Sequence, residues 1–263
     1  MSKIISADGT PIAYTRTGQG PAVILVDGAL SHRAQGINTG LATALAGRFT
    51  VYTYDRRGRG ESGDTAPFAP EREIEDLAAL VAEAGRAHVY GTSSGAALAL
   101  AAVDSGVPVE RLALYEPPFI VDGTRPAIPD DYVRRLDELV ATDRRADAIR
   151  YFFRTGVGLP GFVVGMMRLM PAWPKLKAVA HTLPYDVAFV APYERGEPYP
   201  AAHWASVKVP TLVMDGGKSQ AWIRNAAESL AGLLPNAEYR TLAGQTHIVK
   251  PAALAPVLEG FFR

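Results

Sequence analysis

The chain has 263 residues, of which 48% are hydrophobic and 21% charged, enough to bury the core of one α/β domain that carries an insertion. Lys and Arg number 27, as do Asp and Glu, so the formal net charge is zero. This balance gives no electrostatic attraction to nucleic acid or to an anionic membrane, and neither is expected as a partner. The expected partner is a small, uncharged molecule, and a homodimer is left open.

The sequence contains no cysteine. Disulfides, thiolate nucleophiles and thiolate metal sites are therefore excluded, and no pair of histidines has the spacing of metal ligands. We expect neither a metal nor an organic cofactor. The first residues, MSKIISADGTPIAY, lack the apolar core of a signal peptide, and no later run approaches the ~18 apolar residues of a membrane span. We therefore expect a cytoplasmic protein.

In chain order, short apolar runs of strand length alternate with helix-like stretches. The chain opens with an antiparallel hairpin over residues 3–18 that turns at Asp8-Gly9, and an amphipathic helix is expected over 71–85. This alternation is typical of a mostly parallel sheet with helices on both faces. Further strands are expected at 22–26, 49–54, 87–91, 111–115, 211–214 and 238–242.

The alternation stops between residues 120 and 205, where helical stretches follow one another without strands. Helices inserted between two strands of an open sheet are best placed above the strand ends, where ligands bind. The alternative is that they only extend the core. We predict a core domain formed by 1–119 and 206–263, and a helical cap formed by 120–205.

The segment Gly91-Thr92-Ser93-Ser94-Gly95 matches G-x-S-x-G, with a strand expected before it and a small-residue helix after it. This is the context of a nucleophile elbow. The flanking residues must be small because the nucleophile's backbone is strained and the helix packs closely beneath it. We predict Ser93 as the nucleophile, and the turn directs the amide of Ser94 toward a developing oxyanion.

A serine nucleophile needs a base. His247 lies in a loop between the last strand and the C-terminal helix, which brings it to the same edge of the sheet as Ser93, so His247 is the predicted base. One alternative lies in the strand beneath the site and two in the cap. The full set of histidines is His32, His88, His181, His203 and His247.

These motifs make the chain resemble the α/β-hydrolases over nearly its whole length. Besides the elbow, the resemblance rests on LVDGAL (25–30), YDRRGRGESG (54–63), PTLVMDGG (210–217) and GQTH (244–247). It implies an eight-stranded, mostly parallel sheet with helices on both faces and a helical cap inserted after the sixth strand.

The loop that supplies an oxyanion amide in this family usually reads His-Gly, whereas here it reads Asp27-Gly28-Ala29. A backbone donor does not depend on the missing imidazole. The resemblance therefore implies an oxyanion hole formed by Gly28 or Ala29 together with Ser94. For Asp27 we expect a structural role, in hydrogen bonds to its own loop.

The family's triad acid usually follows the seventh strand, but Ser219 occupies that position. Two carboxylates remain. Asp215 ends the seventh strand, and Glu116 ends the sixth strand, next to the strand that carries the serine. Some α/β-hydrolases use a carboxylate at the latter position, and we predict Glu116 with Asp215 as the alternative. Asp-Gly, Ser-Ser-Gly and Glu-x-Pro in three site loops together resemble the zearalenone lactone hydrolases, which open a macrocyclic aryl ester with a Ser, Glu and His triad.

The resemblance implies a serine hydrolase that cleaves a carboxylic ester or lactone of a bulky apolar small molecule through an acyl-enzyme. Acyl transfer, cofactor-free perhydrolysis and a pseudoenzyme that only binds a small ligand are the alternatives. Arg56, Arg57 and Arg59 are expected to pair with Asp55 or Glu61. For substrate binding we predict contacts from the cap and the adjoining loop: Trp173, Met166, Tyr185 and Pro118.

Overall fold

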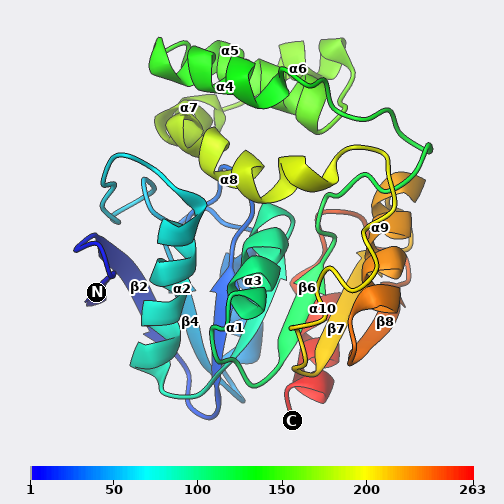
Figure 1. Ribbon diagram of the computed structural model, residues 1–263. Helices are drawn as coiled ribbons and strands as arrows, with labels where there is room; N and C mark the ends of the chain where they lie inside the picture. Colours follow the sequence, from blue (N-terminus) through cyan, green and yellow to red (C-terminus); the bar gives the residue numbers. More distant parts are fainter. Residues whose placement is uncertain (1) are drawn as a thin grey trace.

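A computed structural model describes residues 2–263 and has one eight-stranded sheet in the order β1-β2-β4-β3-β5-β6-β7-β8 (Figure 1). β1 and β4 each pair with β2 in the antiparallel direction, and all other neighbours are parallel. The predicted fold class is confirmed. The strands are β1 Ser2–Ile5, β2 Pro11–Thr17, β3 Ala22–Val26, β4 Thr50–Tyr54, β5 Ala87–Thr92, β6 Leu112–Tyr115, β7 Thr211–Gly216 and β8 Ala237–Leu242.

The opening hairpin is also confirmed, since β1 and β2 form the edge of the sheet and Gly9 turns the chain with φ +85°. The one consequential difference from the predicted strands is the end of β7. This strand runs to Gly216, two residues further than expected, and Asp215 pairs in register with Thr241 of β8. Asp215 is therefore held inside the sheet, whereas Ser93 and Glu116 lie one residue past the ends of β5 and β6.

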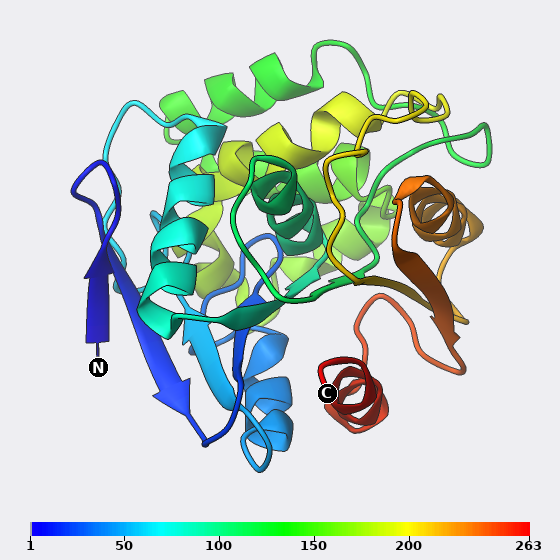
Figure 2. The ribbon, with the colours of Figure 1, turned by 60° about the horizontal axis from the view of Figure 1, so that its bottom comes forward.

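Alternate residues of the strands enter two separate cores. In β3, Val23 and Leu25 face α1 and α10, whereas Ile24 and Val26 face α2, α3 and α9. Figure 2 shows α1 and α10 on the same side of the sheet. These helices have the bounds α1 Asn38–Leu45, α2 Pro70–Ala84, α3 Ser94–Asp104, α9 Ala221–Leu233 and α10 Pro251–Phe261.

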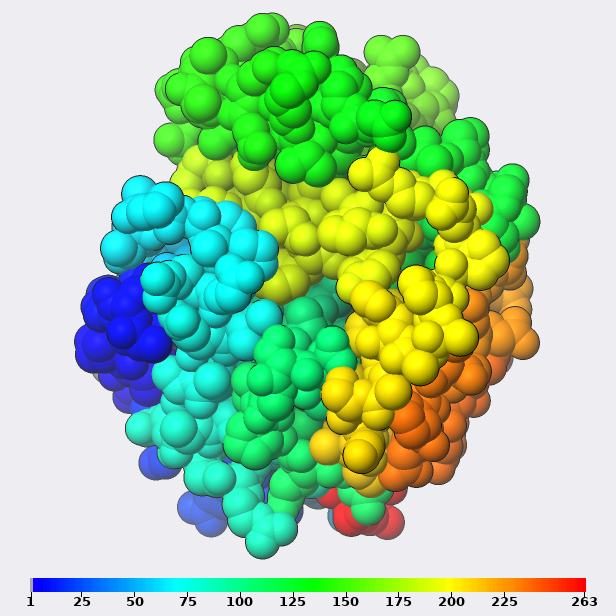
Figure 3. Space-filling view, viewed as in Figure 1, coloured from blue at the N-terminus to red at the C-terminus, as the bar shows by residue number. Residues whose placement is uncertain are grey.

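Between β6 and β7 the chain is helical, as predicted, and this insertion lies across the ends of the strands (Figures 1 and 3). The stretch 130–156 is not one helix but two helices and a π-helical turn, with Asp143 at φ +52° between the helices. α8 lies next to α3, and α4 and α5 lie above it. The elements are α4 Tyr132–Ala141, α5 Arg145–Tyr151, η1 Phe152–Gly156, α6 Gly161–Met167, α7 Trp173–Val179, η2 Ala180–Thr182, α8 Leu183–Val190 and η3 Ala191–Tyr193.

The insertion has a hydrophobic core of its own, in which Leu136, Ile149 and Leu183 from different helices pack together. Trp222 and Ile223 of α9 join the same cluster and connect it to the rest of the molecule. The division into a core domain and a cap at the boundaries 119/120 and 205/206 stays a prediction. No helix within residues 2–263 is both long and apolar enough to cross a membrane.

Candidate active site

The turn between β5 and α3 has the geometry of a nucleophile elbow. Ser93 stands between the strand and the helix with φ +56° and ψ −128°, a conformation that costs ~1–3 kcal/mol unless the surroundings enforce it. Both flanking glycines are required. A Cβ on Gly91 would lie 2.4 Å from the carbonyl oxygen of Gly95, and one on Gly95 would lie 2.5 Å from that of Val26. The close packing of α3 under β3 and β5 therefore presents the Ser93 side chain at the strand ends.

The loop after β3 lies directly against this serine. A Cβ on Gly28 would be 3.1 Å from Ser93 Cβ, so the glycine lets the loop backbone approach Ser93. Arg59 Nη1 donates to the Gly28 carbonyl oxygen at 3.0 Å, which fixes the loop. Ala29 and Ser94 line the same cavity as Ser93. The backbone segments predicted to form an oxyanion hole are thus placed on either side of the serine.

Asp27 does not line the cavity that contains Ser93. It is buried, and its Oδ1 accepts a hydrogen bond from the backbone N–H of Asn38 at 3.4 Å. Burial raises the pKa of Asp27 to about 6. These contacts fit the structural role expected for this carboxylate.

The structure brings Glu116 to the predicted base. The Glu116 side chain is fully buried after β6, and its Oε2 lies 2.7 Å from His247 Nδ1. Its Oε1 accepts a hydrogen bond from the backbone N–H of Gly216 at 2.7 Å. Glu116 has φ +47°, so this backbone, like that of Ser93, is held in a sparsely populated region.

Asp215, the alternative acid, is engaged elsewhere. Its Oδ2 accepts hydrogen bonds from Arg224 Nε at 3.0 Å and from the Tyr239 hydroxyl at 2.9 Å. Asp215 is paired in register within β7 and makes no hydrogen bond to His247, whose Nδ1 is bonded to Glu116. Ser219, which stands where the family's acid usually lies, lines the cavity but makes no hydrogen bond to the histidine.

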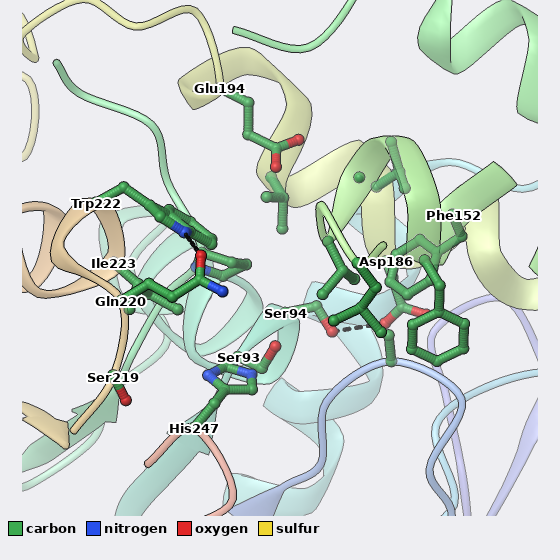
Figure 4. Close-up of a pocket in the computed structure, with 18 of the residues that line it drawn as sticks. Ser93, Ser94, Phe152, Asp186, Glu194, Ser219, Gln220, Trp222, Ile223 and His247 are labelled. Carbon is green, nitrogen blue, oxygen red and sulfur yellow. Dashed lines mark hydrogen bonds between the residues drawn. The ribbon is translucent and has the colours of Figure 1, made fainter. Parts of the chain in front are cut away.

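Ser93 and His247 line the same cavity, and their side chains overlap in the view of Figure 4. The structure has no hydrogen bond between these two side chains. Catalytic hydrogen bonds of this kind are often long before substrate binds. With Nδ1 bonded to Glu116, the other ring nitrogen, Nε2, is the one available to the serine.

The other histidines lie away from this cavity. His88 is buried in β5, where its ring stacks on Phe262 with centroids 4.8 Å apart and burial lowers its pKa. His203 bonds to the Tyr193 hydroxyl at 2.8 Å. His181 lies against the carboxylate of Asp64, and His32 lines a separate surface depression.

The cavity above Ser93 has a volume of about 450 Å³, within the range of small-molecule sites. Pro118, predicted as a substrate contact, lines it. Most of its wall is apolar and comes from the insertion and from α9. These wall residues are Phe152, Phe153, Val157, Leu159, Val187, Val190, Trp222 and Ile223.

Three predicted substrate contacts are not in this cavity. Trp173 is 8% exposed and packs inside the insertion's own core, whereas Met166 is 64% exposed on α6. Tyr185 stacks on Phe68 with ring centroids 3.8 Å apart and donates to Asp64 at 3.1 Å. The reason is helical phase: α8 presents Asp186, Val187 and Val190 to the cavity, so the neighbouring Tyr185 points to another side.

The predicted pairing of Arg56, Arg57 and Arg59 with Asp55 or Glu61 is wrong. All three guanidinium groups are buried and have other carboxylate partners. Arg33 makes the contacts that were expected of them, to both Asp55 and Glu61.

The arginines use acidic side chains from α2, α8 and the hairpin. Arg57 pairs with Asp76 at 2.7 Å and with Asp8 at 2.8 Å. Arg56 forms a bidentate pair with Glu73, at 2.6 and 2.7 Å. These partners lie far from the arginines in the sequence, so a prediction based on neighbouring residues selected Asp55 and Glu61 instead.

Asp186 of α8 joins the insertion to the elbow, and sequence reasoning missed it. Its Oδ1 accepts from Arg56 Nη1 at 2.6 Å and from the Ser94 hydroxyl at 2.7 Å, and its Oδ2 accepts from Arg59 Nη2 at 2.6 Å. Burial alone would raise its pKa, but the charges of Arg59 and Arg56 outweigh that effect and lower the pKa of Asp186. A lone aspartate in the apolar helix LPYDVAFV was the available signal.

The fold and the geometry of this site are those of an α/β-hydrolase. The sequence model of the Alpha/beta hydrolase family matches residues 25–257, and the chain belongs to this family. Among solved structures, it is similar to an alpha/beta hydrolase from Sphaerobacter thermophilus DSM 20745, with 55% identity over 100% of both chains and a TM-score of 0.92.

More distant structures share the fold alone. The enol-lactonase from Burkholderia xenovorans LB400 is 23% identical over 99% of both chains, with a TM-score of 0.68. The esterase RhEst1 from Rhodococcus sp. ECU1013 is 20% identical over 99% of this chain and 97% of that chain, with a TM-score of 0.66. In the part of the chain that the structure describes, no three His, Asp or Glu side chains are grouped to hold a metal ion.

Proposed function

We propose that the protein is a serine hydrolase that cleaves a carboxylic ester or lactone of a bulky apolar small molecule. Ser93 would be the nucleophile, His247 the general base and Glu116 the triad acid. The observation that carries this proposal is the 2.7 Å contact between Glu116 and His247. His247 lines the same cavity as Ser93, whose backbone is strained.

In the proposed reaction, His247 Nε2 takes the proton of Ser93 as Oγ attacks the carbonyl carbon. The developing oxyanion is held by the amide of Ser94 and by that of Gly28 or Ala29. The imidazolium then returns its proton to the leaving oxygen, and water, activated by the same histidine, releases the acyl group from Ser93. Glu116 keeps Nδ1 protonated and stabilises the imidazolium, and its bond from the Gly216 amide fixes its own position.

The substrate class follows from the cavity. A space of about 450 Å³ with a mostly apolar wall favours a bulky substrate of low polarity. The resemblance of three site loops to zearalenone lactone hydrolases favours a lactone, and the esterase and enol-lactonase among the structural neighbours agree with acyl chemistry. Specificity beyond that class depends on the insertion, because it supplies much of the wall.

Labelling with a fluorophosphonate, mapped by mass spectrometry, tests the nucleophile. The wild type should be labelled at Ser93, Ser93→Ala should not be labelled, and Ser219→Ala is the matched control. Ser219 lines the same cavity without contacting the histidine, so its loss should leave the label in place. A label elsewhere, or none on the folded wild type, contradicts the proposal.

Product analysis separates hydrolysis from its alternatives. A chromogenic ester panel is incubated with the wild type in water alone, with added alcohol or amine, and with hydrogen peroxide. We expect the free acid as the main product in each case. A transferred acyl group would show an acyltransferase, a peracid would show a perhydrolase, and ester binding without labelling or turnover would show a protein that only binds its ligand.

A further inference from the structure

One carboxyl group in the cavity has no role in the proposed chemistry. Glu194 follows η3, is 4% exposed and lines the cavity. Figure 4 shows its carboxyl group on the opposite side of the cavity from Ser93 and His247. Within residues 2–263, no side chain or backbone N–H donates a hydrogen bond to it, and no cation forms an ion pair with it.

Two further side chains near Glu194 each have a buried polar atom without a hydrogen-bond partner in the described chain. Tyr132 of α4 is 1% exposed and lines the cavity, and its hydroxyl makes no hydrogen bond. Arg125 Nη2 donates to the Gly156 carbonyl oxygen at 2.5 Å and its guanidinium lies over the Trp222 ring at 4.4 Å, but its Nη1 is buried and unpaired. Gly156 leaves room for the Tyr132 hydroxyl, because a Cβ at this position would lie 2.2 Å from the hydroxyl oxygen.

Such groups are expensive in an apolar wall. Leaving a buried donor or acceptor without a hydrogen bond costs ~1–3 kcal/mol, and more when the group is charged. Burial raises the pKa of Glu194 to about 8, and the charge of Arg125 only partly opposes this. Asp186, which is also buried and lines the same cavity, is by contrast paired with two arginines. Glu194 and Tyr132 both line the cavity, whereas Arg125 is not among its lining residues, and unpaired groups in one cavity wall are what a polar ligand atom would satisfy.

We infer that Glu194 and Tyr132, with Arg125 beside them, form a hydrogen-bonding subsite for a hydroxyl group of the substrate, remote from the ester or lactone bond. This inference rests on the proposed function. A hydroxyl group can donate to Glu194 and accept from Tyr132, both of which line the cavity. Glu194 offers an acceptor and Tyr132 a donor, so a neutral alcohol or phenol, which can both donate and accept, fits the two groups best.

Matched ester pairs test the subsite. One series contains p-nitrophenyl esters of linear acids and of the corresponding ω-hydroxy acids, and a second contains acetate esters of linear alcohols and of the corresponding diols. For at least one chain length in either series, the wild type should prefer the hydroxylated member of the pair by ~10-fold or more in kcat/KM. The same preference should be seen when uncleaved pairs bind to Ser93→Ala in calorimetric titrations.

Variants assign the preference to the residues. Within each variant, the ratio of the two members of a pair should fall to about 1 in Glu194→Leu and in Tyr132→Phe, because each removes a hydrogen-bonding partner. Glu194→Gln, which can still donate and accept, should keep part of the ratio. Glu197→Leu is the matched control on the same segment, since Glu197 is exposed and does not line the cavity, and its ratio should equal that of the wild type.

The outcomes separate this inference from the proposed function. Equal kcat/KM for both members of every pair, or a preference that survives in Glu194→Leu and Tyr132→Phe, overturns the subsite and leaves the hydrolase intact. No hydrolysis of any ester by the folded wild type overturns the hydrolase. The binding ratio on Ser93→Ala then still decides the subsite.

Discussion

The cavity has a floor and a roof that are built in different ways. The floor consists of short loops at the ends of parallel strands, and two of the side chains proposed to be catalytic, Ser93 and Glu116, stand on backbone with positive φ. The roof consists of helices of the insertion, with mostly apolar side chains that pack by shape. We therefore expect the floor to control the rate for every substrate, and the roof to control which substrate is preferred.

A single buried cluster joins the two parts. Asp186 in the roof bonds to Ser94 of the elbow, and Arg59 bonds both to Asp186 and to the loop after β3. The roof is thus fixed to the floor through charges at the point where the oxyanion is expected. Substitutions in the floor, in the roof and in the cluster between them test whether the floor controls the rate and the roof the substrate preference.

Ser93→Ala should have the largest effect. Loss of a serine nucleophile removes up to ~10⁶-fold in kcat, and alanine fits the elbow, so the fold should be unchanged. Ester hydrolysis is the measurement, with circular dichroism as the check on folding. Residual kcat above about one part in a hundred would point to another nucleophile.

Glu116→Gln should come next. The amide misorients the imidazole and withdraws support for the imidazolium, which lowers kcat by ~10² to 10⁴ for small and large esters alike. Asp215→Asn is the matched control, because Asp215 is also a buried carboxylate at a strand end but bonds to Arg224 and Tyr239. If Asp215→Asn were the more damaging change, the assignment of Glu116 would be wrong.

Sequence alone could predict the floor because strand order and turn geometry fix it. Gly91 and Gly95 are required by backbone contacts, and a loop after a parallel strand must lie at the same edge as its neighbours. Ser93, Glu116 and His247 each follow a strand directly or by a few residues, and the structure joins Glu116 to His247. The choice of Glu116 over Asp215 rested on the family resemblance.

The roof could not be predicted in the same way. Trp173, Met166 and Tyr185 are of the same residue types as a pocket wall, but which side chains line the cavity depends on the phase and packing of several short helices. The partners of Arg56 and Arg59 were missed for a related reason, since Asp186 lies more than a hundred residues away in the chain.

Asp186→Asn tests the connection between roof and floor. It leaves two buried guanidinium groups without their shared counter-charge, and we expect unfolding in urea to show a loss of about 3 kcal/mol of stability. Asp130→Asn, in an exposed pair with Arg195 of the same insertion, should cost less than ~1 kcal/mol. Equal small losses would mean that the cluster does not hold the two parts together.

Glu194→Gln tests the electrostatics of the roof. The pKa of Glu194 is raised from 4.5 to about 8 in the folded protein, so the folded state binds more protons than the unfolded state between these values. Stability contributed by this group is therefore present below pH 4.5 and lost as the pH rises to about 8. At pH 8 the variant should exceed the wild type by ~2 kcal/mol or more, and this gap should close toward pH 4.5. A gap that does not change with pH would contradict the raised pKa.

The smallest effect is expected for the shape of the roof. Phe152→Ala removes an aromatic wall from the cavity (Figure 4) and should reduce kcat/KM for a bulky ester by ~10- to 100-fold relative to a small acetate ester, because only the bulky group contacts that wall. Trp173→Ala is the matched control: the indole packs in the insertion's core and not in the cavity, so this change should lower thermal stability and leave the ratio between the two esters near that of the wild type. Ratios of kcat/KM for the two esters, measured well below each variant's melting temperature, provide the comparison. If Trp173→Ala shifted the ratio and Phe152→Ala did not, substrate would contact a part of the insertion outside this cavity, and the assignment of specificity to the observed roof would fail.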